Sequence, residues 1–203
     1  MKAPRNFAID HAGSLKHFHK PWYRAVTETM FGHGCMLTQV NDVARQKSGI
    51  DTVVIARTGR YFVDDKFRNE DHHDLLCETL SDRVHQRLGW MYAHGMRCDF
   101  LHYAILPARI SHFVSYRSIR QAIASHPEWL TFARDSRHGF SCNCSQSTSG
   151  DSQWITDFFC IPMHVVREVI GCTTIYWDDA LARQARAIDS EIDRLMGLER
   201  PSC

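Results

Sequence analysis

No apolar run in this 203-residue chain approaches the roughly 18 to 20 residues needed to cross a bilayer. The N-terminal segment MKAPRNFAIDHAGSLKHFHKPW also lacks the continuous apolar core of a signal peptide. The sequence therefore predicts no membrane partner and a cytoplasmic location. The eight cysteines are scattered without a repeating frame, so we expect reduced thiols rather than disulfides.

The chain has no excess of charge of either sign, with 24 Lys and Arg, 23 Asp and Glu and a formal net charge of +1. No overall basic field marks it as a nucleic-acid-binding protein, and any phosphate-binding surface must be local. Each local basic group, taken alone, is best explained as solvated mixed-charge surface. These groups comprise Lys16, Lys20 and Arg24, then Arg57, Arg60, Lys66 and Arg68, and finally Arg109, Arg117 and Arg120.

Several catalytic motifs are missing as well. The chain contains no GxSxG, Walker-type or GxGxxG sequence, so acyl transfer, P-loop nucleotide hydrolysis and dinucleotide redox chemistry have no support. A zinc site is disfavoured, because the Cys142-Asn143-Cys144 pair lacks the CxxC spacing of a zinc knuckle and no second tight pair follows. Dispersed free thiols are the favoured explanation of these cysteines.

The remaining composition is that of an ordinary globular protein, with 44% hydrophobic and 23% charged residues, and its length suits one domain. The Ser- and Gly-rich stretch from Ser141 to Gln153 is predicted to be a loop. Periodicity and turn residues predict helices at residues 21–32, at 41–47 with Asn41 as its cap, at 89–95 and at 178–196, and strands at 50–56, 61–67, 75–81, 99–107 and 156–166.

The second of these strands ends with the charged sequence VDDKF, residues 63–67. Side chains alternate along a strand, so Asp64 and Lys66 point to one face and Asp65 to the other. The first two strands form a hairpin whose turn we expect to centre on Thr58-Gly59. That register places Asp51 opposite Lys66, within reach of the edge where Asp64 projects.

Two carboxylates that converge from neighbouring strands suit a hard divalent cation such as Mg²⁺ or Mn²⁺. The ammonium group of Lys66 would balance charge and help to orient or deprotonate a water molecule. This combination suits phosphodiester hydrolysis, in which a metal polarises a phosphoryl oxygen and lowers the pKa of the attacking water. If instead Asp51 and Asp64 are surface acids and Lys66 is their solvated partner, the contact is worth little.

Asp51 followed by Asp64-Asp65-Lys66 on the second strand of a hairpin resembles the PD-(D/E)XK nuclease superfamily. The resemblance implies an α/β fold with a restriction-endonuclease-like αβββαβ core at about residues 20–107. A central mixed sheet would be flanked by helices, with a C-terminal strand and helix extension at about 108–203 of the same domain. Asp51 matches the first acidic ligand, Asp64 the acid of the (D/E)xK element and Lys66 its lysine.

A narrower likeness follows in DLLCETLSD and LGWMYAHGMRCDFLHYAI, which are similar to a phage and bacterial branch of this superfamily. It implies that Glu78, on the third strand, is a further metal ligand or water-orienting base. The chain departs from the family pattern at Ile50, where the name-giving proline would stand. Asp65 is unusual at an x position that faces the core, so we expect either that it has a basic or backbone partner or that this face of the hairpin is partly open.

Together these features predict a Mg²⁺- or Mn²⁺-dependent endo- or exonuclease, for which DNA is favoured over RNA as the substrate and the sequence does not decide between the two. The catalytic residues would be Asp51, Asp64, Lys66 and Glu78. The alternative is a non-catalytic member of the fold that binds nucleic acid or protein in a phage or mobile-element setting. The last helix has an apolar stripe, for which packing on its own domain is the first explanation and a homodimer contact the second, at Leu181, Ala185, Ile188, Ile192 and Leu195.

Overall fold

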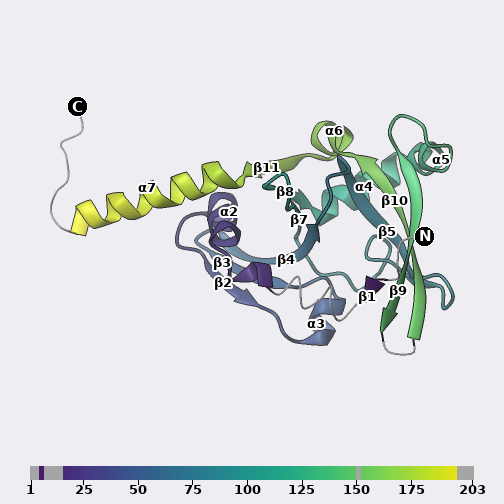
Figure 1. Ribbon diagram of the computed structural model, residues 1–203, viewed down its shortest axis with the longest axis horizontal. Coiled ribbons are helices and arrows are strands. Elements are labelled where there is room, and N and C mark those ends of the chain that lie inside the picture. Colours follow the sequence, from purple (N-terminus) through teal and green to yellow (C-terminus); the bar gives the residue numbers. More distant parts are fainter. Residues whose placement is uncertain (1–4, 7–15, 150–151, 196–203) are drawn as a thin grey trace.

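Two β-sheets and the helices that cover them form the protein (Figure 1). The structure is a computed structural model that describes residues 5–6, 16–149 and 152–195. It confirms an α/β protein whose central sheet is mixed. No helix in the described residues is long and apolar enough to pass through a membrane.

The central sheet has six strands in the order β11-β8-β7-β4-β3-β2. Its pairings are antiparallel except for β4 and β7, which run parallel. The sequence analysis did not predict the strands β2, β8 and β11. The strands are β2 (Met36–Gln39), β3 (Thr52–Ala56), β4 (Gly59–Arg68), β7 (Phe100–Ile105), β8 (Ile110–Ser115) and β11 (Cys172–Tyr176).

The second sheet has five strands in the order β1-β9-β10-β5-β6. The prediction of a loop from residue 141 was wrong, because residues 141–149 form a strand that pairs antiparallel with β10. Its polar side chains are tolerated because a sheet can leave one face open to solvent. The strands are β1 (Arg5–Asn6), β5 (Asp74–Asp82), β6 (Arg87–Leu88), β9 (Ser141–Ser149) and β10 (Ser152–Pro162).

The helices pack at the sheets and extend the molecule at one end (Figure 1). The predicted first helix is confirmed at residues 21–31, with a proline in its first turn and Gly32 as its C-cap at φ 107°. The cap of α3 is Asp42 rather than Asn41, because its side chain accepts hydrogen bonds from the amides of Ala44 and Arg45. The helices are α2 (Pro21–Phe31), α3 (Val43–Lys47), α4 (Tyr116–Ser125), α5 (Glu128–Arg134), α6 (Met163–Val165), the π-helical turn η1 (Val166–Ile170) and α7 (Trp177–Leu195).

The central sheet has a hydrophobic core on each face. On one face, α2 and the start of α7 pack with residues such as Val63, Ala104 and Phe113. On the other face, residues such as Leu101 and Tyr103 of β7 join residues of β5, β10 and α4 in a second core. The central sheet is therefore a layer between α2 on one side and the five-stranded sheet with α4 on the other.

The segment between β4 and β7 departs from the predicted order of elements. The predicted strand at 75–81 exists as β5, but it belongs to the five-stranded sheet and not to the sheet of β4. The helix predicted at 89–95 is wrong, because these residues form turns. A Cβ atom at Gly89 would lie 2.4 Å from the carbonyl oxygen of Glu78, so this backbone must pass close against β5.

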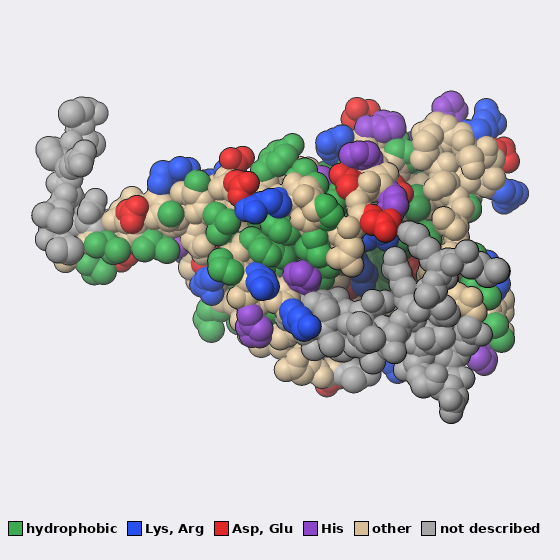
Figure 2. Space-filling model, viewed as in Figure 1, with side chains coloured by type: hydrophobic (Ala, Val, Ile, Leu, Met, Phe, Trp, Pro, Cys, Tyr) green, Lys and Arg blue, Asp and Glu red, His purple; other side chains and the backbone are tan. Residues whose placement is uncertain are grey.

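The last helix, α7, is longer than the helix on which it packs. Its 19 residues span about 28 Å, whereas the 11 residues of α2 span about 16 Å. The indole rings of Trp22 and Trp177 stack at 3.8 Å where the two helices meet. Farther along, Ile188, Ile192 and Leu195 are exposed, so only the first part of the predicted stripe packs on its own domain (Figure 2).

Candidate functional site

The hairpin of β3 and β4 brings Asp51 beside Asp64. Ala56 pairs with Gly59 and Thr52 with Val63, so the turn lies one residue earlier than predicted. The predicted position of Asp51 opposite Lys66 was therefore wrong, and continuing the observed register places Asp51 opposite Asp64. The Asp51 amide donates to the carbonyl oxygen of Val63 at 2.9 Å, which extends the ladder to this residue.

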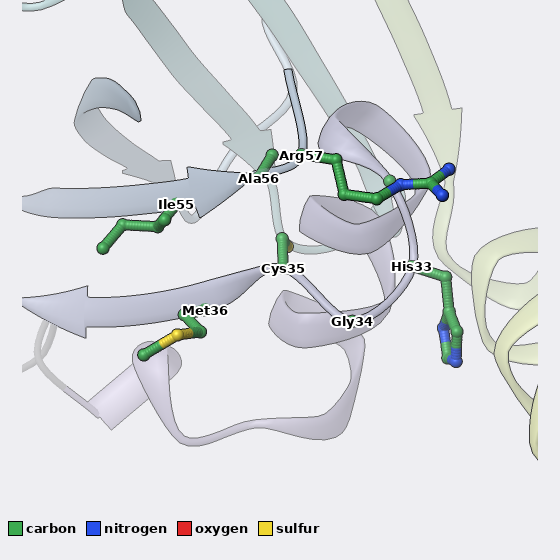
Figure 3. A pocket seen from close by; sticks show the side chains of 8 residues that line it. His33, Gly34, Cys35, Met36, Ile55, Ala56 and Arg57 are labelled. Atoms are coloured by element: carbon green, nitrogen blue, oxygen red, sulfur yellow. The ribbon is translucent and has the colours of Figure 1, made fainter. Parts of the chain in front are cut away.

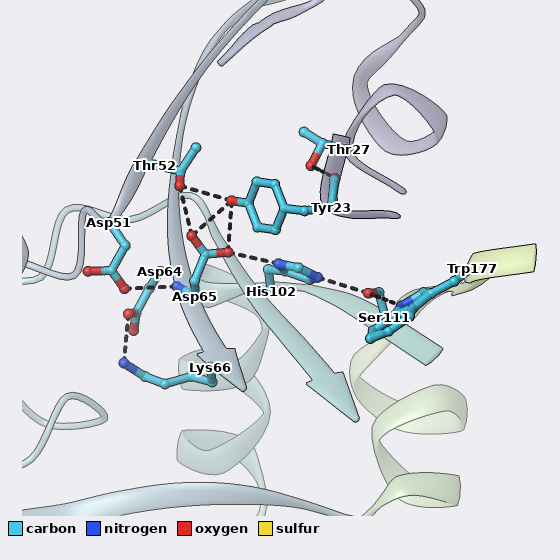
Figure 4. Close-up of polar contacts among 10 residues, drawn as sticks. All are labelled: Tyr23, Thr27, Asp51, Thr52, Asp64, Asp65, Lys66, His102, Ser111 and Trp177. Atoms are coloured by element: carbon cyan, nitrogen blue, oxygen red, sulfur yellow. Dashed lines mark hydrogen bonds and ion pairs between the residues drawn. The ribbon is translucent and has the colours of Figure 1, made fainter. Parts of the chain in front are cut away.

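Asp64 and Lys66 point to the same face of β4, as the alternation predicted (Figure 4). The Lys66 ammonium lies 2.7 Å from Asp64 Oδ1, and the two side chains are 37% and 3% exposed. The register with β7 pairs Asp64 with Leu101 and Lys66 with Tyr103, so both charged groups face the five-stranded sheet. The second oxygen of Asp64, Oδ2, is buried and has no hydrogen-bond partner among the described residues.

The carboxyl group of Asp51 is held from the backbone of β4. The amide of Asp65 donates to Asp51 Oδ2 at 3.0 Å. Burial raises the pKa of Asp51 well above its usual value, and the neighbouring charge of Asp64 raises it further, although Lys66 acts in the opposite direction. Two carboxyl groups therefore share a partly dry site with a single ammonium group.

Lys66 and Glu78 also affect one another electrostatically. Burial lowers the pKa of Lys66, but the charges of Asp64, Asp51 and Glu78 outweigh burial and raise it overall, so the side chain is an ammonium ion. Burial raises the pKa of Glu78, and the charge of Lys66 partly offsets this effect. Among the described residues, the ion pair of Lys66 is with Asp64, and Glu78 acts from β5 without direct contact.

Asp65 points to the opposite face of β4 and is fully hydrogen-bonded (Figure 4). Its carboxyl oxygens receive the hydroxyl groups of Tyr23 at 2.9 Å and Thr52 at 2.8 Å. The Nδ1 atom of His102 lies 2.7 Å from Asp65 Oδ1. This confirms the expected basic partner, but its identity was missed because no local pattern links β7 to β4.

Two hollows at the surface are further candidate binding sites. The hollow in Figure 3 has a volume of about 240 Å³ and lies between the α2–β2 loop and the β3–β4 turn, where His33, Cys35 and Arg57 line it. It contains none of the acidic residues of the hairpin. A second hollow of about 300 Å³ includes Cys98 and Tyr116 in its wall, and the charge of Asp64 acts on both residues. Of the two, only the second lies near the carboxylates.

Arg68 is the next basic side chain on the face of β4 that carries Lys66. Figure 2 shows Lys and Arg side chains dispersed among hydrophobic ones on the face that it presents. Arg68 continues the row of Asp64 and Lys66 and lies with its guanidinium group over the ring of Tyr103, at 5.9 Å from the ring centre. The strand therefore places a second basic side chain beyond Lys66, farther from the carboxylates.

The donor set was tested for its fit to a metal ion. Within the described residues, no cluster of three or more His, Cys, Asp or Glu side chains has the geometry to hold a metal. Asp51 and Asp64 alone fit Mg²⁺ or Mn²⁺, because such ions are often held by one or two carboxylates and keep several waters. The buried Asp64 Oδ2 supplies an oxygen that accepts no hydrogen bond from residues 16–149 or 152–195. Cys142 and Cys144 are exposed free thiols on β9, and Glu78 stays a predicted ligand.

The arrangement can therefore bind a cation, hold an ammonium group beside it and present both to a phosphate group. The site is open to solvent, because more than a third of the Lys66 side-chain surface is exposed. Comparisons of the chain with protein-family models, curated proteins and solved structures give no match.

Proposed function

We propose that the protein is a metal-dependent nuclease that hydrolyses phosphodiester bonds, with DNA as its substrate and Mg²⁺ or Mn²⁺ as its cofactor. The observation that carries the proposal is the buried Oδ2 of Asp64, which has no hydrogen-bond partner in the part of the chain that the structure describes. It lies next to Asp51, on the carboxylate whose other oxygen binds Lys66. A buried acceptor without a partner costs about 1–3 kcal/mol. A bound cation would remove this cost.

Strand order supports the same proposal. α2 precedes three antiparallel strands, β2, β3 and β4, and β7 then lies parallel beside β4. Helix, antiparallel meander and a parallel fourth strand match the αβββαβ order of a restriction-endonuclease-like core except for its second helix. The helix expected between the last two strands is replaced here by β5, β6 and the turns that follow.

Each side chain has a role that its position permits. Asp51 and Asp64 would hold the cation, which when bound would polarise a phosphoryl oxygen and lower the pKa of a water ligand. Lys66 would donate hydrogen bonds to the water or to a phosphate oxygen and would offset the negative charge that develops there. Arg68, two residues along the same face, would bind an adjacent phosphate of the nucleic acid.

The experiment compares the wild-type protein with Asp64→Asn on labelled DNA and RNA substrates, single- and double-stranded, in Mg²⁺, Mn²⁺ or chelator. Asp157→Asn is the matched control. Asp157 is also a carboxylate on a strand and forms an ion pair with Arg83, but it lies in the five-stranded sheet, on β10. We expect metal-dependent cleavage of DNA by the wild type and the control, and loss of cleavage in Asp64→Asn.

Calorimetric titration with Mn²⁺ separates catalysis from binding. The wild type should bind Mn²⁺, and Asp51→Asn should abolish tight binding while circular dichroism shows an intact fold. Undiminished cleavage by Asp64→Asn would remove the assignment. DNA binding without any Mn²⁺ binding would instead identify a non-catalytic protein.

A further inference from the structure

A buried chain of hydrogen bonds runs from α7 to the centre of the candidate site (Figure 4). It begins at the Nε1–H of Trp177, which donates to Ser111 Oγ at 2.9 Å. Ser111 Oγ lies 2.9 Å from His102 Nε2, and His102 Nδ1 lies 2.7 Å from Asp65 Oδ1. Residues from α7, β8, β7 and β4 are thereby joined in one polar path through an otherwise apolar core.

The direction of this chain follows from its ends. An indole N–H can only donate, so Ser111 Oγ accepts from Trp177 and has its own proton free for His102 Nε2. His102 then carries its proton on Nδ1 and donates it to Asp65. Tyr23 and Thr52 add their hydroxyl protons, so the Asp65 carboxyl group receives three donors.

The chain is too deeply buried to act on a substrate directly. His102 and Ser111 have no exposed surface, and the side chain of Asp65 is only 7% exposed. An Asp–His–Ser series with these distances could suggest a nucleophilic serine, but Ser111 cannot be reached. Burying polar groups costs free energy unless every member is satisfied, and an apolar residue at position 65 would fill this place more simply.

The backbone of Asp65 links the two faces of β4. Its side chain is held by the chain on one face, while its amide donates to Asp51 Oδ2 on the other. Thr52, which also binds Asp65, directly follows Asp51. Any movement of the Asp65 backbone would therefore change the position of the Asp51 carboxylate and of the flanking Asp64 and Lys66.

We propose that Asp65 and His102 are positioning residues: the buried chain from Trp177 fixes the Asp65 backbone, which orients the Asp51 carboxylate beside Asp64. The importance of this role for cleavage rests on the proposed nuclease function. The orientation of the Asp51 carboxylate does not depend on that function, and it can be measured without metal or substrate.

The test uses two replacements of the same histidine. The amide nitrogen of an asparagine side chain occupies about the place of histidine Nδ1, so His102→Asn keeps the donor to Asp65 and loses the contact with Ser111. The longer glutamine places its amide nitrogen near Nε2, so His102→Gln loses the donor to Asp65. His112→Gln is the matched control, because His112 is a buried histidine of the same sheet whose Nδ1 contacts Thr174 instead.

Amide hydrogen exchange, followed by NMR in the metal-free full-length protein, reports the bond from the Asp65 amide to Asp51. We expect His102→Gln to accelerate exchange of the Asp65 amide by about tenfold or more relative to the amides of β8, which correct for any change in global stability. His102→Asn and His112→Gln should leave that ratio within about threefold of wild type. An equal ratio in His102→Gln and His112→Gln would overturn the proposal.

Kinetics then tests the link to function. If the wild type cleaves DNA, His102→Gln should lower kcat about tenfold with little change in KM, and His102→Asn should restore most of the rate. A wild type that binds no Mn²⁺ and cleaves nothing would refute the nuclease function, and the exchange ratio would still decide the positioning role. A kcat in His102→Gln equal to that of His112→Gln would overturn the catalytic part of the proposal.

Discussion

The two faces of β4 carry neighbouring aspartates in opposite circumstances. Asp65 faces α2 and receives hydrogen bonds from three side chains. Asp64 faces the five-stranded sheet, where one oxygen binds Lys66 and the other has no partner among the described residues. One strand therefore holds a completed polar network on one side and an incomplete one on the other. We call the side of Asp65 the closed face and the side of Asp64 the open face.

The difference indicates which acid is structural and which is free to bind a ligand. A saturated carboxyl group has no lone pair in a useful direction left for a metal ion, so Asp65 serves the fold. A buried oxygen that accepts no hydrogen bond destabilises the folded protein, and such unfavourable groups are concentrated at functional sites. Substitutions that remove groups from one face at a time should therefore have different effects.

The largest expected effect is on activity, from the open face. Lys66→Ala should lower the rate of DNA cleavage by about 10³-fold, because the proposed function makes this ammonium group a donor to the reacting phosphate. The measurement is the single-turnover rate in saturating Mg²⁺. Arg83→Ala, which removes the cation from the Asp157 ion pair on the other sheet, should cleave at the wild-type rate. A rate in Lys66→Ala close to that of Arg83→Ala would contradict the role of Lys66.

The closed face should show its largest effect in stability. Asp65→Ala leaves His102 Nδ1 without its acceptor and leaves Tyr23 and Thr52 with only the hydrogen bond between their own hydroxyl groups, so we expect a loss of about 3 kcal/mol in the free energy of unfolding. Urea denaturation measures it. Asp64→Asn should cost less than about 1 kcal/mol, because the asparagine side chain keeps an oxygen that can accept the hydrogen bond of Lys66. Equal losses in both variants would mean that the two faces do not differ as described.

Local pattern was sufficient to predict these two faces. Alternation along residues 61–67 assigns Asp64 and Lys66 to one side and Asp65 to the other, and the structure agrees. The register was wrong by one turn position, because either Arg57-Thr58 or Thr58-Gly59 can occupy the centre of the hairpin turn. Which acid lies opposite Asp51 depends on that choice, and side-chain pattern does not decide it.

The sequence did not reveal which distant strands pair with one another. The strand at 141–149 has the composition of a loop and is extended because β10 offers it a ladder of hydrogen bonds. β5 has the expected pattern of a strand, but it pairs with β10, far later in the chain, and with the short β6 rather than with β4. His102 and Trp177 are likewise connected to the site only through the folded arrangement.

The pH dependence of stability tests the open face in the metal-free protein. Since the folded state raises the pKa of Asp51 above its ordinary value near 4, the folded protein binds a proton that the unfolded chain has released. Stability from this group is thus lost as pH rises above about 4, with a ceiling of about 1.4 kcal/mol per pH unit for one proton. Urea unfolding in chelator at pH 5 and pH 7 should show the wild type losing stability relative to Asp51→Asn. A wild-type stability that rises relative to Asp51→Asn between pH 5 and pH 7 would exclude this effect, and Mn²⁺ should restore the wild type at pH 7.

The smallest effect is expected at the far end of the closed face. Trp177→Phe keeps an aromatic ring against Trp22 but removes the N–H that donates to Ser111, so one buried acceptor loses a single neutral hydrogen bond. Such a bond contributes about 1 kcal/mol, and Ser111 can still donate to His102, so the chain as far as Asp65 should remain. Urea denaturation should therefore show a loss near this value, well below that of Asp65→Ala, with cleavage within about twofold of wild type. A loss of cleavage as large as that of His102→Gln would mean that the position of α7, and not only the contact between His102 and Asp65, controls the geometry of the open face.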